Sequence, residues 1–315
     1  MPDMFGSAQS VGTRTLACGL SCWDVTNLTQ WFSPPPQLQE HEALLGEFKH
    51  GWQYYASKPL EIAALGQLQC DLAPPGARRN AVSTGKARIH SCMGPFSAIW
   101  LLVSPTTNGL TIANDLLQCA VRRRLGIACS FDGPDAHGHA RLAEGLGGRL
   151  HTRHKEIVAV WRQVFQEAGG SVPDKNVERL LSRTNVPVPP HDLRRLDLVV
   201  PGLNIDRGLP LFCDATILSP ISRNGQPRPG TSNNGGSLLV RAEHDNNHTY
   251  HEVQESGLGS LYSLGAEVFG RWGGQSIHLV PALARERSRG LNSRIRRGAN
   301  LSLQHRWWGL LGIGL

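Results

Sequence analysis

The chain has 315 residues, 40% of them hydrophobic, which suffices for one large or two ordinary domains. Charged residues make up 18% of the sequence, while glycine and proline number 35 and 20, so the composition excludes a coiled coil and favours a globular protein with long irregular stretches. No apolar run approaches the roughly 18 residues that cross a bilayer, and residues 1–22 lack the order of a secretory signal, which predicts an intracellular protein without membrane contact.

The N-terminal part is expected to be helical after an irregular start. Residues 1–40 lack periodicity and contain the proline run 34–36, which predicts a disordered or loosely attached segment. Residues 41–128 form a predicted helical region. Apolar spacing predicts a helix over 40–64, a loop over 71–86, and two helical stretches within 94–127, the second ending near Gly126.

An α/β order is expected from residue 151 to residue 283. Apolar residues at helical spacing predict a helix over 154–168 that ends at Gly169. The period then changes to that of strands at 195–200 and 210–218, which a turn-rich connection joins into a hairpin. A helix over 238–254, a strand over 265–270 and a helix over 275–285 follow. This order of helix, hairpin strands, helix and strand predicts an α/β fold.

Two aspartates in the predicted hairpin are the most informative pair for function. Asp197 and Asp214 each stand within an apolar strand pattern, where aspartate is depleted. Two carboxylates that converge across a hairpin can hold Mg²⁺, which activates water and screens the charge that develops on a phosphodiester. The alternative is a pair of exposed aspartates near strand ends. The sequence contains no G-x-x-x-x-G-K loop, G-x-S-x-G elbow or H-E-x-x-H motif.

Several short motifs, in order from about residue 45 to the end, resemble a known family. They are His50-Gly51-Trp52-Gln53-Tyr54-Tyr55, Ser91-Cys92-Met93-Gly94-Pro95, Arg122-Arg123-Arg124-Leu125-Gly126, Gln166-Glu167-Ala168-Gly169-Gly170, Asp214-Ala215-Thr216-Ile217-Leu218-Ser219-Pro220, Thr249-Tyr250, Glu267 to Trp272, and Arg306-Trp307-Trp308-Gly309. The chain resembles the C-terminal region of non-LTR retrotransposon reverse transcriptase/endonuclease polyproteins, as kept in uncharacterised reverse-transcriptase-related reading frames. That region carries a restriction-endonuclease-like PD-(D/E)xK domain with an αβββαβ fold, so the resemblance implies a mixed sheet flanked by helices.

The resemblance implies a set of catalytic positions. Asp197 and Asp214 stand where the two family acids bind Mg²⁺, and Glu156 matches an accessory acid in the preceding helix. The family lysine, a few residues before the Thr-Tyr pair, falls on Asn246. No lysine follows Lys175 anywhere in the chain, so no other one can replace it.

The resemblance also implies a Cys/His zinc knuckle, which falls in residues 129–150 and is incomplete here. Cys129, His137 and His139 remain, but Ala143 stands where the fourth ligand is expected. A structural zinc site needs four ligands, and Cys119 lies within a predicted helix, where a small core residue is the simpler role. We therefore expect residues 129–150 to be a degenerate linker that binds no zinc.

Positive charge is concentrated near the C-terminus. The formal net charge is +7, and residues 284–306 contain seven arginines against the single acid Glu286. Six of these arginines are candidate contacts for DNA or RNA phosphates, namely Arg285, Arg287, Arg289, Arg294, Arg296 and Arg297. The alternative is a solvated helix face. Residues 284–315 thus form a predicted arginine-rich tail, in which Trp307 and Trp308 are expected to be packed anchors rather than base-stacking platforms.

These features predict a degenerate retroelement endonuclease domain whose Mg²⁺-dependent hydrolysis of phosphodiester bonds is impaired or lost. Its partners would be DNA or RNA, and its location nuclear. Two alternatives stay open: a nucleic-acid-binding protein without catalysis, and a decayed reading frame without selected function.

Overall fold

The computed structural model describes residues 79–102, 110–127, 138–143, 149–172, 178–179 and 184–315. These residues belong to one compact unit, Arg78–Leu315. The predictions for residues 1–40, for the helix over 40–64 and for the ligands Cys129 and His137 therefore lie outside the described residues.

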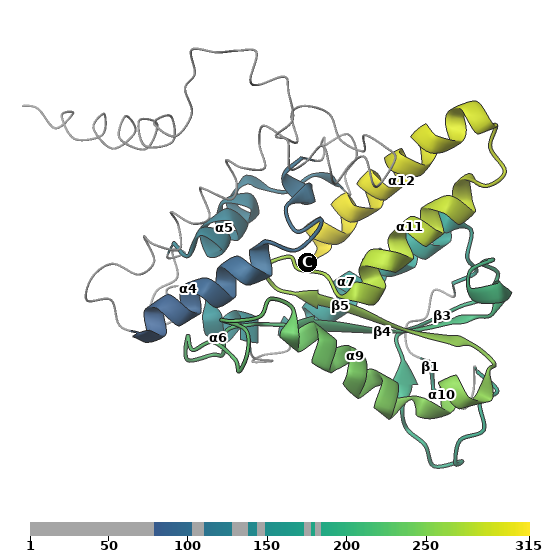
Figure 1. The fold of residues 1–315 in the computed structure, drawn as a ribbon, viewed down its shortest axis with the longest axis horizontal. Coiled ribbons are helices and arrows are strands. Elements are labelled where there is room, and N and C mark those ends of the chain that lie inside the picture. The colour runs from purple at the N-terminus through teal and green to yellow at the C-terminus, as the bar shows by residue number, and fades with distance from the viewer. Residues whose placement is uncertain (1–78, 103–109, 128–137, 144–148, 173–177, 180–183) are drawn as a thin grey trace, which may run out of the picture. The chain divides into compact units, whose positions relative to one another are not determined.

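The described unit combines a small sheet with helices (Figure 1). The elements before the sheet are α4 (Arg79–Cys92), the 3-10 helix η2 (Ile99–Leu101), α5 (Asn114–Leu125), α6 (His139–Ala143) and α7 (Arg149–Ala168). The strands are β1 (Glu178–Arg179), β2 (Arg195–Leu196), β3 (Leu198–Val200), β4 (Leu211–Leu218) and β5 (Ser260–Glu267). A 3-10 helix η5 (Asp206–Gly208) precedes β4, and α9 (Ser237–Thr249), α10 (His251–Ser256), α11 (Gly274–Ser288) and α12 (Ser293–Gly314) complete the unit.

Strand β4 is the centre of a three-stranded mixed sheet in the order β3-β4-β5. β3 pairs with it antiparallel, with Leu198 opposite Cys213, and β5 pairs with it parallel, with Asp214 opposite Ser263. β1 and β2 form a separate antiparallel pair. A mixed sheet flanked by helices was predicted, and this part of the prediction is confirmed.

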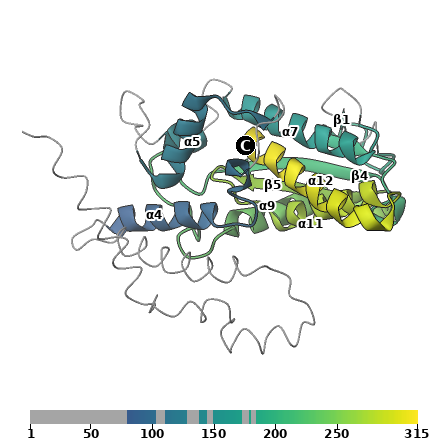
Figure 2. The ribbon, with the colours of Figure 1, turned by 90° about the horizontal axis from the view of Figure 1, so that it is seen from above.

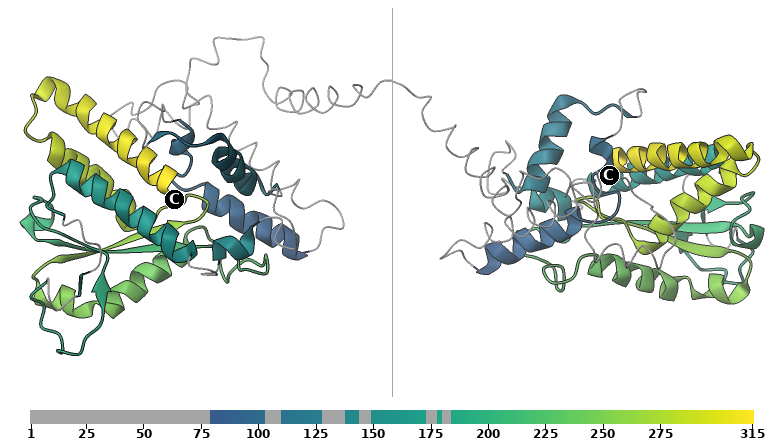
Figure 3. Two further views of the ribbon diagram at one scale, coloured as in Figure 1. Left: turned by 180° about the vertical axis from the view of Figure 1, so that it is seen from behind. Right: turned by 45° about the horizontal axis from the view of Figure 1, so that its top comes forward.

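Helix α7 covers one face of the sheet (Figure 3). Its stripe of Ile157, Trp161, Val164 and Phe165 is at most 1% exposed and packs in one cluster with residues of β3, β4 and β5. Gly169 follows at φ 101°, a conformation that costs other residues energy, and the helix ends there. The predicted helix and its packing stripe are confirmed, although the helix begins five residues earlier, at Arg149.

The other helices complete the core. Seen from above, α9 lies on the side of the sheet opposite α7 (Figure 2). Helix α11 contacts β5 and also α7, and its buried residues belong to the same cluster as the α7 stripe. Helix α12 packs along α11 and α7, where Trp307 and Trp308 are fully buried and Phe96 stacks on Trp308 with ring centroids 4.5 Å apart. The two tryptophans are thus packed anchors, as predicted. Arg306 donates to Glu167 Oε1 at 2.8 Å, which fixes α12 to α7.

Three secondary-structure predictions were wrong. The loop over 71–86 is helical from Arg79, because α4 buries Ala87 in a cluster with Phe269 and tertiary packing overrides weak local propensity. The first helical stretch of 94–127 is reduced to the short η2. The strand over 265–270 instead spans Ser260–Glu267, because every residue of it pairs with β4.

Candidate functional site

The predicted strand over 195–200 is interrupted at Asp197. Its backbone N–H still donates to the Cys213 carbonyl oxygen at 3.1 Å, but β2 ends before it and β3 begins after it. The Asp197 carboxylate oxygen Oδ2 accepts from the backbone N–H of Ala215 at 2.8 Å. The backbone N–H groups that pair neighbouring strands point along the plane of the sheet. The Asp197 carboxylate therefore lies beside β4 and takes the place of a neighbouring strand at that position.

Asp214 lies on the face of β4 that α9 covers. Side chains alternate along a strand, and Cys213 and Ala215 belong to the cluster around α7, so Asp214 projects to the opposite side. Its Oδ2 accepts from Asn246 Nδ2 at 2.9 Å and from Thr216 Oγ1 at 3.4 Å. The second predicted acid is therefore held between the sheet and α9.

Asn246 lies beside Asp214, at the position where the resemblance implies a lysine. Its Nδ2 donates both to Asp214 and to Ser263 Oγ, the latter at 3.1 Å. Ser263 is the β5 residue directly opposite Asp214 in the parallel register. The amide thus connects α9 to both strands, and it offers the carboxylate a neutral donor where a lysine would offer a charge.

The two aspartates repel each other. Burial, followed by the charge of Asp197, raises the pKa of Asp214 to about 6. The hydrogen bond from Asn246 opposes this rise but does not cancel it. Within the described residues, the recorded bonds to both carboxylates go to Oδ2, so Oδ1 of Asp197 and Oδ1 of Asp214 have no protein partner.

Helix α7 contributes His154 to this cluster, rather than Glu156. His154 Nε2 lies 3.1 Å from Asp197 Oδ2 and 3.0 Å from the Ala215 carbonyl oxygen. The hydrogen bond to Asp197 raises the pKa of His154 against the opposing effect of burial. Glu156 is exposed, and the ionisable side chain whose pKa it affects is Arg153. The structure therefore brings together three of the four predicted catalytic residues and leaves Glu156 apart.

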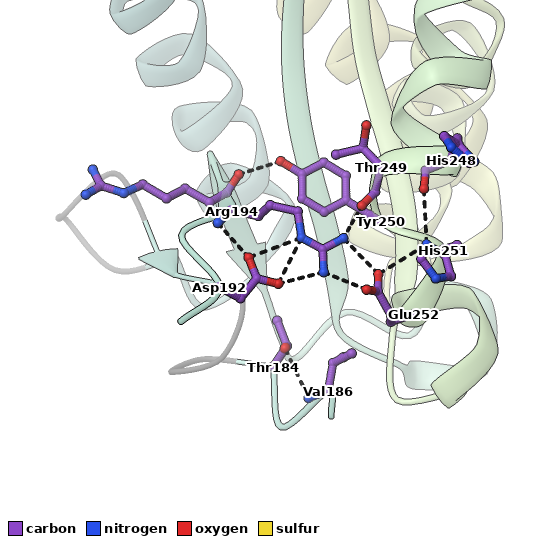
Figure 4. Close-up of polar contacts among 10 residues, drawn as sticks. Thr184, Val186, Asp192, Arg194, His248, Thr249, Tyr250, His251 and Glu252 are labelled. Atoms are coloured by element: carbon purple, nitrogen blue, oxygen red, sulfur yellow. Dashed lines mark hydrogen bonds and ion pairs between the residues drawn. The ribbon is translucent and has the colours of Figure 1, made fainter. Parts of the chain in front are cut away.

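A network of hydrogen bonds positions the chain just before Asp197 (Figure 4). Arg194 lies between Asp192 and Glu252, and its two Nη2 contacts to their carboxylates are each 2.6 Å long. Its Nη1 also donates to the Thr249 carbonyl oxygen. The Tyr250 hydroxyl donates to the Arg195 carbonyl oxygen at 2.6 Å, and burial raises the pKa of this phenol. The segment that leads into Asp197 is thereby fixed to the junction of α9 and α10.

Sequence reasoning missed His154 and Ser263. His154 precedes Ile157 and Val158 by three and four residues and so lies on the buried stripe of the helix, where a polar residue indicates a partner. Ser263 carries no such signal, because its role depends on the parallel register of β4 and β5.

A metal ion here would have few protein ligands. Among the described residues, no group of three or more His, Cys, Asp or Glu side chains is arranged to hold an ion. Two carboxylates with two open oxygens still fit Mg²⁺, which keeps several waters and is often bound through one or two carboxylates. The zinc prediction remains a prediction, because two of its ligands lie outside the described residues.

The six candidate arginines lie on α11, on α12 and in the loop between them. All six are exposed.

The comparisons with known proteins leave the family open. No protein-family model matches the chain, and no curated protein matches it. Within the described ranges, no helix combines the length and the apolar character that crossing a bilayer requires. The retroelement origin stays a prediction from the resemblance.

Proposed function

We propose that the chain is a retroelement-derived endonuclease domain with a restriction-endonuclease-like fold, in which Asp197 and Asp214 hold Mg²⁺ for the hydrolysis of DNA phosphodiesters. The observation that carries the proposal is the pair of carboxylates, one on β4 and one at the break between β2 and β3, each with Oδ2 fixed by the protein and Oδ1 open. The order of α7, β3, β4, α9 and β5 contains one strand fewer than the αβββαβ order of that fold and otherwise follows it, which supports the proposal. A retroelement endonuclease acts on chromosomal DNA, so the proposal includes a nuclear location.

The protein residues would prepare the site in distinct ways. His154 and the Ala215 N–H fix the orientation of the Asp197 carboxylate, and Asn246 fixes that of Asp214. Above a pH of about 6 Asp214 loses its proton, and its negative charge beside the Asp197 carboxylate, which His154 offsets in part, favours a cation. Bound Mg²⁺ would supply a Lewis acid that lowers the pKa of a water and stabilises charge on the phosphoryl oxygens.

The missing lysine limits this activity. Asn246 carries no charge, and its amide nitrogen already donates to Asp214 and Ser263, so it cannot stabilise the negative charge on the phosphate as a lysine would. Loss of one such group costs roughly 10² to 10⁴ in rate. We therefore propose a slow enzyme.

The decisive experiment restores the lysine. Asn246→Lys should accelerate Mg²⁺-dependent nicking of supercoiled plasmid by roughly 10² or more, the lower end of what one catalytic group contributes. The matched control is His244→Lys, which adds a lysine at an exposed position two residues earlier on the same helix. The double variant Asn246→Lys with Asp214→Asn should be inactive.

Binding of Mn²⁺, a spectroscopic substitute for Mg²⁺, checks the metal site separately from the rate. Wild-type protein should bind the ion above a pH of about 6 and lose it below, because protonation of Asp214 removes a ligand. Folded Asn246→Lys that nicks no faster than His244→Lys, together with wild-type protein that binds no Mn²⁺, would refute the proposal and leave the chain without a catalytic site here.

A further inference from the structure

Helices α11 and α12 enclose an open hollow of about 440 Å³. One wall carries Arg285 from α11 and Arg289, the residue that follows α11, and the other wall carries Arg296 and Arg297 from α12. Ser293, Asn300 and Leu301 also line it. The arginine run of the sequence is therefore divided between two walls that face each other across one concave surface, which we call the arginine groove.

The charges of this groove are mostly uncompensated. Glu286 lies 3.2 Å from Arg289 Nη2, which is the one carboxylate contact recorded for these four arginines within the described residues. Arg296 donates through Nε and Nη2 to the Leu291 carbonyl oxygen, a neutral acceptor, at 3.2 and 3.0 Å. Arg285 and Arg297 have no recorded protein partner in that part of the chain. At least two guanidinium groups thus remain available to an anion.

The position of the groove on α12 is a second indication of an anion. The helix begins at Ser293, has no acidic residue in its first turn and carries Arg294, Arg296 and Arg297 within its first five positions. The positive end of the helix dipole disfavours cations there, and the same end attracts anions. Arginines at the C-terminal end of α11 are explained by its dipole, but those on α12 are not.

We propose that the arginine groove binds the sugar–phosphate backbone of a nucleic acid. Two opposed walls with two arginines each suit a row of phosphates better than one isolated phosphate, and the guanidinium forks can bind phosphate oxygens bidentately. Leu301 and Asn300 offer an apolar and a hydrogen-bonding contact of the kind that a sugar takes. The concave shape disfavours the flat surface of a lipid bilayer. The inference adds a binding surface to the proposed function and shares only the nucleic-acid ligand with it.

The test compares two double variants with equal change in charge. Arg285→Gln with Arg297→Gln removes the two unpartnered arginines of the groove, whereas Arg287→Gln with Arg294→Gln removes two exposed arginines of the same helices that do not line it. Binding of a labelled DNA duplex, a labelled RNA duplex and phosphatidylserine vesicles is measured in EDTA, so that the result does not depend on Mg²⁺ or on cleavage.

Salt dependence gives the expected magnitudes. The logarithm of the binding constant for duplex DNA falls by about 0.9 per phosphate contact for each tenfold rise in salt concentration. If all four arginines contact phosphates, affinity should therefore fall roughly 150-fold between about 50 and 200 mM salt. The groove variant should retain two contacts and fall roughly 12-fold over the same range, while the control variant should behave as the wild type does. RNA that binds more tightly than DNA in the same groove-dependent manner would identify RNA as the ligand.

Three outcomes would overturn the proposal. Equal weakening by both double variants would show that net charge, and not the groove, determines binding. No effect of either would make the arginines a solvated face. Vesicle binding that depends on Arg285 and Arg297, with no binding of either duplex, would replace the nucleic acid by an anionic membrane surface. Because cleavage is absent from this assay, an inactive Asp197 and Asp214 pair would not change its result.

Discussion

Replacing Asp214 by asparagine should stabilise the protein at neutral pH. The asparagine oxygen can still accept the bonds from Asn246 and Thr216, whereas the buried negative charge disappears. That charge is unfavourable in the folded state, because burial and the nearby Asp197 raise the pKa of Asp214 from 3.8 to about 6. The variant therefore removes a repulsion that the wild type carries whenever both aspartates are ionised.

The magnitude and the pH range follow from this shift. At 1.36 kcal/mol per pKa unit, a rise of about two units corresponds to about 3 kcal/mol. The folded state keeps its proton to a higher pH than the unfolded state, so wild-type stability should decline as pH rises from 3.8 to about 6 and level off above. Asp214→Asn lacks this decline and should exceed the wild type by up to about 3 kcal/mol at neutral pH.

Urea denaturation followed by tryptophan fluorescence, in EDTA and across this pH range, measures the difference. Asp245→Asn is the matched control, because this aspartate is exposed on the same helix and its loss should change little. If Asp214→Asn were less stable than the wild type at neutral pH while Asp245→Asn stayed neutral, the carboxylate would be favourably solvated. The argument for a repelled pair that attracts a cation would then fail.

Three further changes test the surroundings of the site. His154→Gln should destabilise the protein by about 1 kcal/mol, and more strongly at acidic pH. Because the pKa of His154 is raised in the folded protein, the histidine stabilises the fold below pH 6.5 and loses this effect as pH rises through its folded pKa. Denaturation on both sides of that pH measures the difference. Arg194→Met should lower the free energy of unfolding by about 1–3 kcal/mol at neutral pH, because it leaves the carboxylates of Asp192 and Glu252 facing each other without a cation. The loss should be smaller in acid, since Arg194 lowers the pKa of both carboxyl groups in the folded protein. A series of melting temperatures against pH measures this dependence. Trp161→Ala removes a side chain with 0% exposure and should cost about 3–5 kcal/mol in urea denaturation.

The sequence predicted those parts of the fold that depend on local periodicity. The α7 stripe and its end at Gly169 follow from apolar spacing and from one glycine, and the antiparallel pairing of β3 with β4 follows from two short strands around a turn-rich connection. The extent of β5 did not follow, because Ser260 to Leu264 joins the sheet through parallel pairing with a strand more than 40 residues earlier. The register between two parallel strands so far apart in the chain cannot be predicted from the local pattern of a single sequence.

The same distinction between local pattern and long-range packing applies to the site residues. Asp197 and Asp214 could be identified because aspartate is unusual within an apolar strand. The break of the strand at Asp197 could not be predicted, because it depends on a hydrogen bond from the Ala215 N–H to the Asp197 side chain in place of a backbone carbonyl. Glu156 was selected by position in the resemblance, although the helical period places His154, two residues earlier, on the buried stripe. The arginine run was visible as charge, but its division between two facing walls required the packing of α11 on α12.

The residue at position 246 connects the electrostatics of the site with its chemistry. A lysine there would lower the pKa of Asp214 through its positive charge. With Asn246 that charge is absent and the pKa of Asp214 rises to about 6, so Asp214 is more easily protonated yet needs a cation more when ionised. Under the proposed function, asparagine in place of lysine would remove a catalytic charge and leave both carboxylates in place for a metal. Because Asn246 bonds to both Asp214 and Ser263, it also preserves the packing of α9 on the sheet. Under the proposed function, a lower rate and an intact fold would therefore be separate consequences of asparagine at this position.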